Sequence, residues 1–305
     1  MAFALDLDRP IAPQLRTLAD AELAKARAGI ARPPPELEDG IHAARRALRR
    51  SRALVELALP RGSDARDAFE TPVRLAGREL SALRDLHSAY GTLAWLADDG
   101  RGTVGPSIRA QLALVLAREH RRVMRDAEER IASAGTHLRA AGMASNFVDG
   151  DADVDVVAGL SRAYARARRA LEVALEAGTE ETIHRFRRRA RTYHWQLELV
   201  RGARPVVAEA EANEVRKLTQ AIGQARDLHL MARRLARRRD AVSPAIVRAI
   251  GRLEGKAARL RTVALEAARI AFAEARRAHR QRWRAMVAAR GDASGRPVAI
   301  ERAAV

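Results

Sequence analysis

Long stretches rich in Ala, Leu, Arg and Glu, separated by short segments that contain Pro or Gly, make up most of this 305-residue chain. These four residue types are strong helix formers, and the period-2 alternation of β-branched residues that indicates strands is missing from the sequence. The absence of cysteine excludes a disulfide framework and a thiolate metal site. The sequence therefore predicts an all-α protein with enough chain for one large or two medium-sized domains.

Eight helical stretches are expected, four on each side of a polar segment at residues 143–155. Pro and Gly bound them because neither continues a helix well. We interpret 143–155 as a linker between the halves 10–142 and 152–290 of a single domain that spans 1–305. The expected helices are Ile11–Ala31, Glu36–Leu59, Thr71–Asp98, Pro106–Gly142, Val156–Glu176, Thr179–Arg201, Val206–Asp240 and Pro244–Arg290.

An internal repeat relates the two halves at a constant offset of 142 residues. The tetrapeptide Arg-Asp-Leu-His begins at Arg84 and again at Arg226, and the dipeptide Ile-His ends at His42 and again at His184. Self-similarity at a fixed spacing is typical of a duplicated structural unit. We therefore expect two tandem helical bundles related by pseudo-two-fold symmetry.

Positive charge dominates the composition, with 56 Lys and Arg against 38 Asp and Glu and a net charge of +18. Almost all of these cations are Arg, whose guanidinium group forms bidentate hydrogen bonds with phosphate oxygens and stays protonated. This balance predicts a polyanionic partner. A bias of base composition towards Ala and Arg is the alternative that composition alone leaves open.

Two of the expected helices carry a basic stripe at equivalent positions of the repeat. On a helix, the members of the first stripe fall within an arc of about 80°. Like charges at this spacing destabilise a helix, and a bound polyanion would compensate, although a solvated basic face is the simpler alternative. The first stripe consists of His42, Arg45, Arg49 and Arg52 with Arg46 at its edge, and the second of His184, Arg187, Arg191 and His194 with Arg188 at its edge.

Two further basic rows have helical spacing and are expected to line the same cleft as the stripes. One includes Arg118, Arg122 and Arg125, and the other includes Arg252, Lys256 and Arg259. The acid of each Arg-Asp pair is instead interpreted as structural, orienting an Arg of a neighbouring helix.

The paired pattern His-x-x-Arg-x-x-x-Arg, which begins at His42 and at His184 and is followed 42 residues on by Arg-Asp, resembles the CHAD family, named for a conserved histidine α-helical domain. The resemblance covers residues 10–290 and implies two helical bundles around a central basic groove or pore that binds inorganic polyphosphate. The chain departs from the family pattern where His194 and Trp195 replace Arg-Tyr, which removes a permanent charge, and where Arg191 replaces Lys. The resemblance places in the groove His42, Arg45, Arg49, Arg52, His184, Arg187 and Arg191.

The sequence contains no nucleophile elbow, no His-Glu-x-x-His and no complete phosphate loop, so we expect no enzymatic activity, no cofactor and no metal. The expected function is non-catalytic binding of inorganic polyphosphate. Weak, sequence-independent nucleic-acid binding and a scaffold role in granules are the alternatives, since charge alone does not separate these partners.

The expected location is the cytoplasm, including polyphosphate granules, because the N-terminus is acidic and the sequence has no long apolar run. For the same reason no membrane partner is expected. The oligomeric state is left open.

Overall fold

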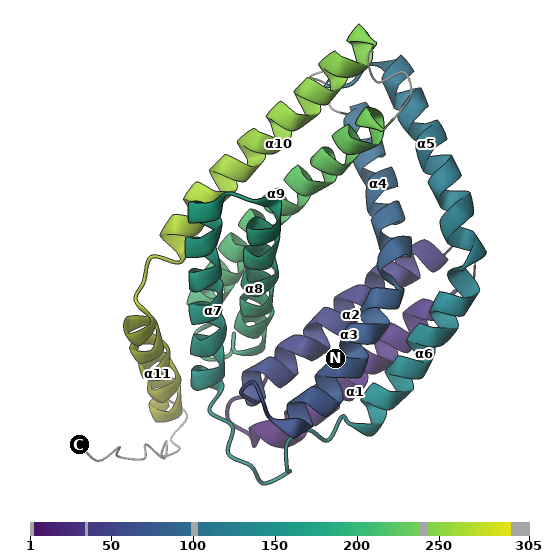
Figure 1. Cartoon of the computed structure of the whole chain (residues 1–305). Coiled ribbons are helices and arrows are strands. Elements are labelled where there is room, and N and C mark those ends of the chain that lie inside the picture. The colour runs from purple at the N-terminus through teal and green to yellow at the C-terminus, as the bar shows by residue number, and fades with distance from the viewer. Residues whose placement is uncertain (1–2, 34–35, 99–102, 238–242, 294–305) are drawn as a thin grey trace.

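A computed structural model describes residues 3–33, 36–98, 103–237 and 243–293, and these residues form α-helices joined by short connections, with no strand among them. Figure 1 shows α1, α2, α3 and α6 side by side at one end, while α4, α5, α9 and α10 extend to the opposite end. The all-α prediction is confirmed. The helices are α1 (Ile11–Ile30), α2 (Leu37–Ala58), α3 (Asp64–Glu79), α4 (Ser81–Asp98), α5 (Pro106–Arg125), α6 (Ala127–Met143), α7 (Val156–Ala177), α8 (Glu180–Leu199), α9 (Pro205–Ala236), α10 (Pro244–Ala271) and α11 (Arg276–Ala293).

Three of the expected helices are wrong in extent, because each is two helices separated by a bend. The bends lie at Leu80, at Asp126 and just after Phe272. Leu80 and Phe272 are buried at 0% and 2% exposure, so two of the bends place an apolar side chain in the core and contain neither Gly nor Pro. Conversely, Pro72 lies inside α3 and does not mark its start. The expected end of one helix at Asp240 lies outside the described residues.

Close contacts at glycine hold α2 in the middle of the molecule. A Cβ atom at Gly40 would lie 2.1 Å from the carbonyl oxygen of Gly29 on α1, and one at Gly159 of α7 would lie 2.1 Å from the carbonyl oxygen of Leu57. Only residues without a Cβ allow the backbones to approach this closely. As a result α2, which carries the first basic stripe, packs against α1 on one side and against α7 and α8 on another.

Two hydrophobic clusters form the core, and each draws on both halves of the sequence. The larger cluster joins α1, α2, α3 and α6 to α7, α8, α11 and parts of α9 and α10. The smaller joins α4 and α5 to the remaining parts of α9 and α10. The helices of each half pack mainly with one another, and the two halves also share both hydrophobic clusters.

The segment between α6 and α7 contains no helix, as expected of the linker, but it is packed against the core. Phe147 is buried against Phe69, with ring centroids 4.9 Å apart. Asp155 caps α7 by accepting a hydrogen bond of 2.7 Å from the backbone N–H of Ala158. Among the described helices, none combines the length and the apolar character that crossing a membrane requires.

Candidate anion-binding site

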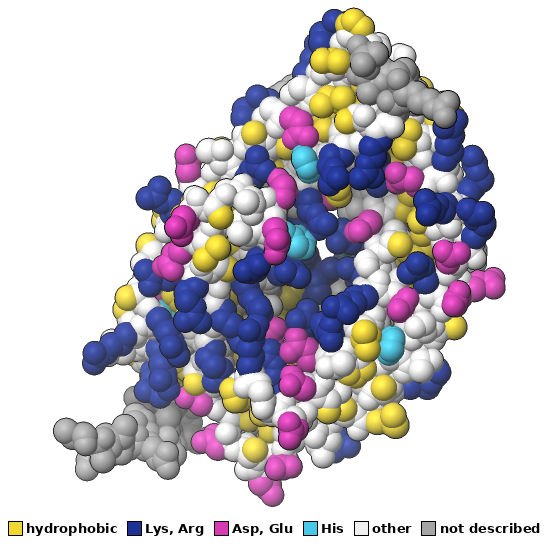
Figure 2. All heavy atoms as spheres, viewed as in Figure 1, with side chains coloured by type: hydrophobic (Ala, Val, Ile, Leu, Met, Phe, Trp, Pro, Cys, Tyr) yellow, Lys and Arg dark blue, Asp and Glu magenta, His cyan; other side chains and the backbone are white. Residues whose placement is uncertain are grey.

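A cavity of about 280 Å³ lies where α2, α4 and α8 meet, and we name it the central arginine pocket. Figure 2 shows a hollow in this part of the surface with Lys and Arg side chains around it. No Asp or Glu occurs among the described residues that line it. The lining consists of Arg45, Arg49, Arg52, Arg84, His184, Arg187, Arg188, Arg189, Arg191, Thr192 and Trp195.

Backbone carbonyls, rather than carboxylates, hold two of the stripe arginines in place. Arg45 donates a hydrogen bond to the carbonyl oxygen of Gly77, and Arg187 Nε donates one of 2.8 Å to that of Thr219. The Nε atoms of Arg45, Arg49 and Arg84 are buried without an acceptor in the described part of the chain. Buried N–H donors without acceptors are unfavourable, so an anion that accepted hydrogen bonds from them would stabilise the pocket.

Burial and mutual repulsion make the positive charges of the pocket costly. Burial, followed by the charges of Arg191 and Arg45, lowers the pKa of Arg49 to about 8. Burial and then the charge of Arg191 lower the pKa of Arg187 to about 9. An anion placed between these groups would act in the opposite direction and stabilise the charged guanidiniums.

Two of the three stripe histidines, His42 and His184, have pKa values that are lowered by the same kinds of interaction. Burial, followed by the charges of Arg226 and Arg188, lowers the pKa of His184 to about 4. Partial desolvation of the ring and then the charge of Arg46 lower the pKa of His42. His184 also lies 3.4 Å from an Nη atom of Arg226, measured from its Nδ1.

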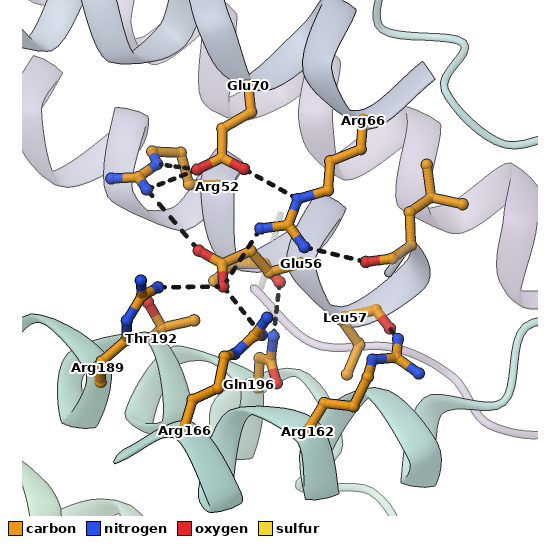
Figure 3. A network of polar contacts seen from close by, with 12 residues as sticks. Arg52, Glu56, Leu57, Arg66, Glu70, Arg162, Arg166, Arg189, Thr192 and Gln196 are labelled. Atoms are coloured by element: carbon orange, nitrogen blue, oxygen red, sulfur yellow. Dashed lines mark hydrogen bonds and ion pairs between the residues drawn. The ribbon is translucent and has the colours of Figure 1, made fainter. Parts of the chain in front are cut away.

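A buried carboxylate at one side of the pocket gathers arginines from four helices (Figure 3). Glu56 of α2 is 1% exposed and lies 3.0 Å from Arg166 of α7, 3.5 Å from Arg66 of α3 and 3.9 Å from Arg189 of α8. Arg52 lies 3.8 Å from the same carboxylate. Since Arg52 and Arg189 also line the pocket, Glu56 fixes one of its walls.

Four predicted site residues differ from expectation. His194 is buried, with Nδ1 3.1 Å from the carbonyl oxygen of Ala212, so its ring packs in the core and does not face the pocket. Arg52 lines the pocket, but its guanidinium donates two hydrogen bonds to Glu70. His42 and Arg46 are exposed and are not part of the lining, because they lie at the outer end and edge of the stripe.

The two further basic rows do not line the same cavity, which corrects the sequence-based expectation. Arg118, Arg122 and Arg125 border an open depression on α5. Arg252, Lys256 and Arg259 border another on α10, where Lys256 Nζ also stacks 4.1 Å from the ring centroid of Trp95. Neither lining shares a residue with the central arginine pocket, because α5 and α10 contribute nothing to it.

Sequence reasoning missed four lining residues: Arg84, Arg189, Thr192 and Trp195. Arg84 belongs to the repeated Arg-Asp pair, and this repetition was the available signal, although the pair was interpreted as structural. No comparable signal distinguished Arg189 from the adjacent arginines of α8.

The comparisons with known proteins agree with this architecture. The model of the CHAD domain family matches residues 11–213, about two thirds of the chain. This chain belongs to the CHAD domain family. The crystal structure of the CHAD domain from the plant Ricinus communis matches with a TM-score of 0.58 and 18% sequence identity, over 90% of this chain and 96% of that one. No curated protein matches.

One glycine of this CHAD domain makes room for Arg187. A Cβ atom at Gly223 of α9 would lie 2.3 Å from Nη2 of Arg187. We expect Gly223→Ala to displace this flexible side chain and lower anion affinity roughly tenfold, as for one lost charged hydrogen bond. Because Ala has a higher helix propensity than Gly, the substitution favours α9, and the midpoint temperature of thermal unfolding should not fall.

Isothermal titration with polyphosphate and thermal unfolding would measure both effects. The matched control is Gly91→Ala, since a Cβ atom at Gly91 of α4 meets nothing within 4 Å. An affinity of Gly223→Ala equal to that of the control would show that the position of Arg187 is unimportant.

Proposed function

We propose that this CHAD domain binds inorganic polyphosphate in the central arginine pocket and performs no catalysis. The observation that carries the proposal is the lining itself, whose described residues include eight arginines and no acid, although Arg52, Arg84 and Arg189 pair with carboxylates outside it. Guanidiniums that form no ion pair with another described residue, such as those of Arg49 and Arg191, offer paired N–H donors to phosphate oxygens, and a phosphoanhydride chain carries a negative charge on successive units. Binding would therefore relieve both the charge repulsion and the buried donors without acceptors.

We further propose that the pocket is a central groove between two duplicated halves. The offset of 142 residues maps Arg45 onto Arg187 and Gly77 onto Thr219, and the structure pairs each Arg with the carbonyl of the corresponding residue. The same offset places the bounds of α2 at 179–200, next to those of α8 at 180–199. Equivalent contacts at equivalent positions support duplication beyond sequence similarity.

Nucleic acid is the second candidate partner, since phosphodiesters also attract guanidiniums. The pocket contains one aromatic side chain, Trp195, whereas single-strand binders present several aromatics on which successive bases stack. This contrast favours a phosphate polymer without bases. Association with polyphosphate granules in the cytoplasm would follow from such binding.

A direct competition experiment tests the proposed function. Fluorescently labelled long-chain polyphosphate is displaced by unlabelled polyphosphate, single-stranded DNA or duplex DNA at equal phosphate concentration, at about 150 mM salt where exposed charges are partly screened. We expect polyphosphate to compete at least roughly tenfold better than either DNA, a difference of about one bidentate contact. Equal competition would instead identify a general polyanion-binding protein.

We expect polyphosphate affinity to rise roughly tenfold between pH 7 and pH 5. A bound anion raises the pKa of His184 from about 4 towards its ordinary value. Binding therefore takes up a proton, so affinity increases as pH falls through the pKa of the complex and levels off near pH 4. Titration of wild type and His184→Gln measures this, and the substitution should flatten the profile. Identical pH profiles would contradict the role of His184.

A further inference from the structure

A second group of arginines lies on α5, outside the central arginine pocket. We name Arg118, Arg121, Arg122 and Arg125 the α5 arginine row; all four are exposed and have i, i+3, i+4, i+7 spacing. They border an open depression of about 680 Å³ with His120 and Met124. Figure 2 shows basic side chains along this edge of the molecule, where α5 lies in Figure 1.

Within the part of the chain that the structure describes, the α5 arginine row has no carboxylate partner. No ion pair between described residues involves any of its four members. Glu119, on the same helix, accepts hydrogen bonds of 3.2, 3.1 and 2.9 Å from Arg234 of α9 and is thereby occupied. Asp126 is the next acid and follows the last member of the row at the helix end. Like charges at this spacing destabilise a helix by a few tenths of a kcal/mol per pair.

The row forms a straight, rigid strip. Its members span about 10 Å along the axis at the ordinary rise of a helix. The helix packs against α4, α6, α9 and α10, which fixes its direction. A strip of this kind fits several consecutive phosphates of an extended chain, whereas His120 is the one ring among the described residues of its lining, fewer than the several aromatics on which successive bases stack.

We infer that the α5 arginine row is a second contact surface for polyphosphate, so that one molecule holds two separate segments of the polymer. This inference rests on the proposed function. The two surfaces have no residue in common, and therefore only a chain long enough to reach both can occupy them together. Linked binding of this kind raises affinity without any new contact at the first site.

The test measures the affinities of the variant Arg118→Ser/Arg121→Ser/Arg122→Ser/Arg125→Ser for tripolyphosphate and for polyphosphate of about 100 units. Because only the long chain gains from linked binding, its affinity should fall roughly tenfold or more. Affinity for tripolyphosphate should stay within about twofold of wild type. For the long chain, the slope of log affinity against log salt should decrease by about 3, as expected for four lost charge contacts. Isothermal titration at several salt concentrations measures both quantities.

The matched control removes the same charge from arginines that are already paired with acids, three of them exposed and one, Arg168, half-buried: Arg9→Ser/Arg168→Ser/Arg185→Ser/Arg284→Ser. A loss equal to that of the control, or an equal loss for short and long chains, would overturn the second surface. A variant that loses affinity only for duplex DNA would assign the row to nucleic acid and also overturn it. Failure of the proposed function itself would give a different result, because the wild-type protein would then not bind tripolyphosphate or the long chain in preference to DNA.

Discussion

Replacement of Arg49 and Arg191 together by Gln is expected to lower polyphosphate affinity by about 100-fold or more, since each charged hydrogen bond contributes about 1.5–3 kcal/mol. Both residues line the central arginine pocket, and neither forms an ion pair with another described residue. The same substitution should raise the thermal midpoint by roughly a few degrees, because it removes two repelling charges from a buried cluster. Loss of binding with gain of stability is typical of a site whose charges serve a ligand.

Isothermal titration and thermal unfolding of the purified chain measure the two effects. The control variant Arg9→Gln/Arg185→Gln removes equal charge from exposed residues, 76% and 51% exposed, and should change affinity by less than about threefold. If both variants weaken binding equally, the net charge of the protein, rather than the pocket, attracts the polymer. If the Arg49 and Arg191 variant is less stable than wild type, these charges support the fold.

The helix type and the two basic stripes could be predicted from sequence, because composition and a 3.6-residue period determine them locally. The position of Arg45 and Arg187 in a central groove was instead implied by the resemblance to the CHAD family. The exclusion of His194 could not be predicted, because its neighbour Ala212 lies on another helix. Periodicity assigns a residue to a face of a helix, but the packing of neighbouring helices decides how far along that face the pocket extends.

The separation of the basic rows was likewise beyond the sequence. Arg118 and Arg252 have the same helical spacing as the stripes, and only the directions of α5 and α10 place them elsewhere. The bends at Leu80 and Phe272 carry no Gly or Pro in the sequence, and both residues are buried in the folded chain. Long-range packing therefore determines which of several similar arginine rows share a cavity.

Glu56→Gln is expected to lower the free energy of unfolding by about 3–5 kcal/mol, the usual cost of removing one partner from a buried ion pair. The substitution would leave Arg66, 3% exposed, and Arg166, 13% exposed, without the carboxylate that they share. Urea unfolding measures the change. Glu198→Gln is the matched control, since Glu198 is the repeat equivalent of Glu56 and forms no ion pair with the other described residues; we expect a change within about 0.5 kcal/mol.

A double-mutant cycle separates lost charge pairing from a simple packing defect. Arg166→Gln should destabilise wild type, because it removes the guanidinium closest to Glu56, at 3.0 Å. In the Glu56→Gln background, Arg166→Gln should instead increase stability, because the guanidinium is then a buried charge without a counterion. An equal effect of Arg166→Gln in both backgrounds would mean that Glu56 acts through packing alone. Opposite signs would show that one carboxylate holds arginines of both sequence halves together beside the central arginine pocket.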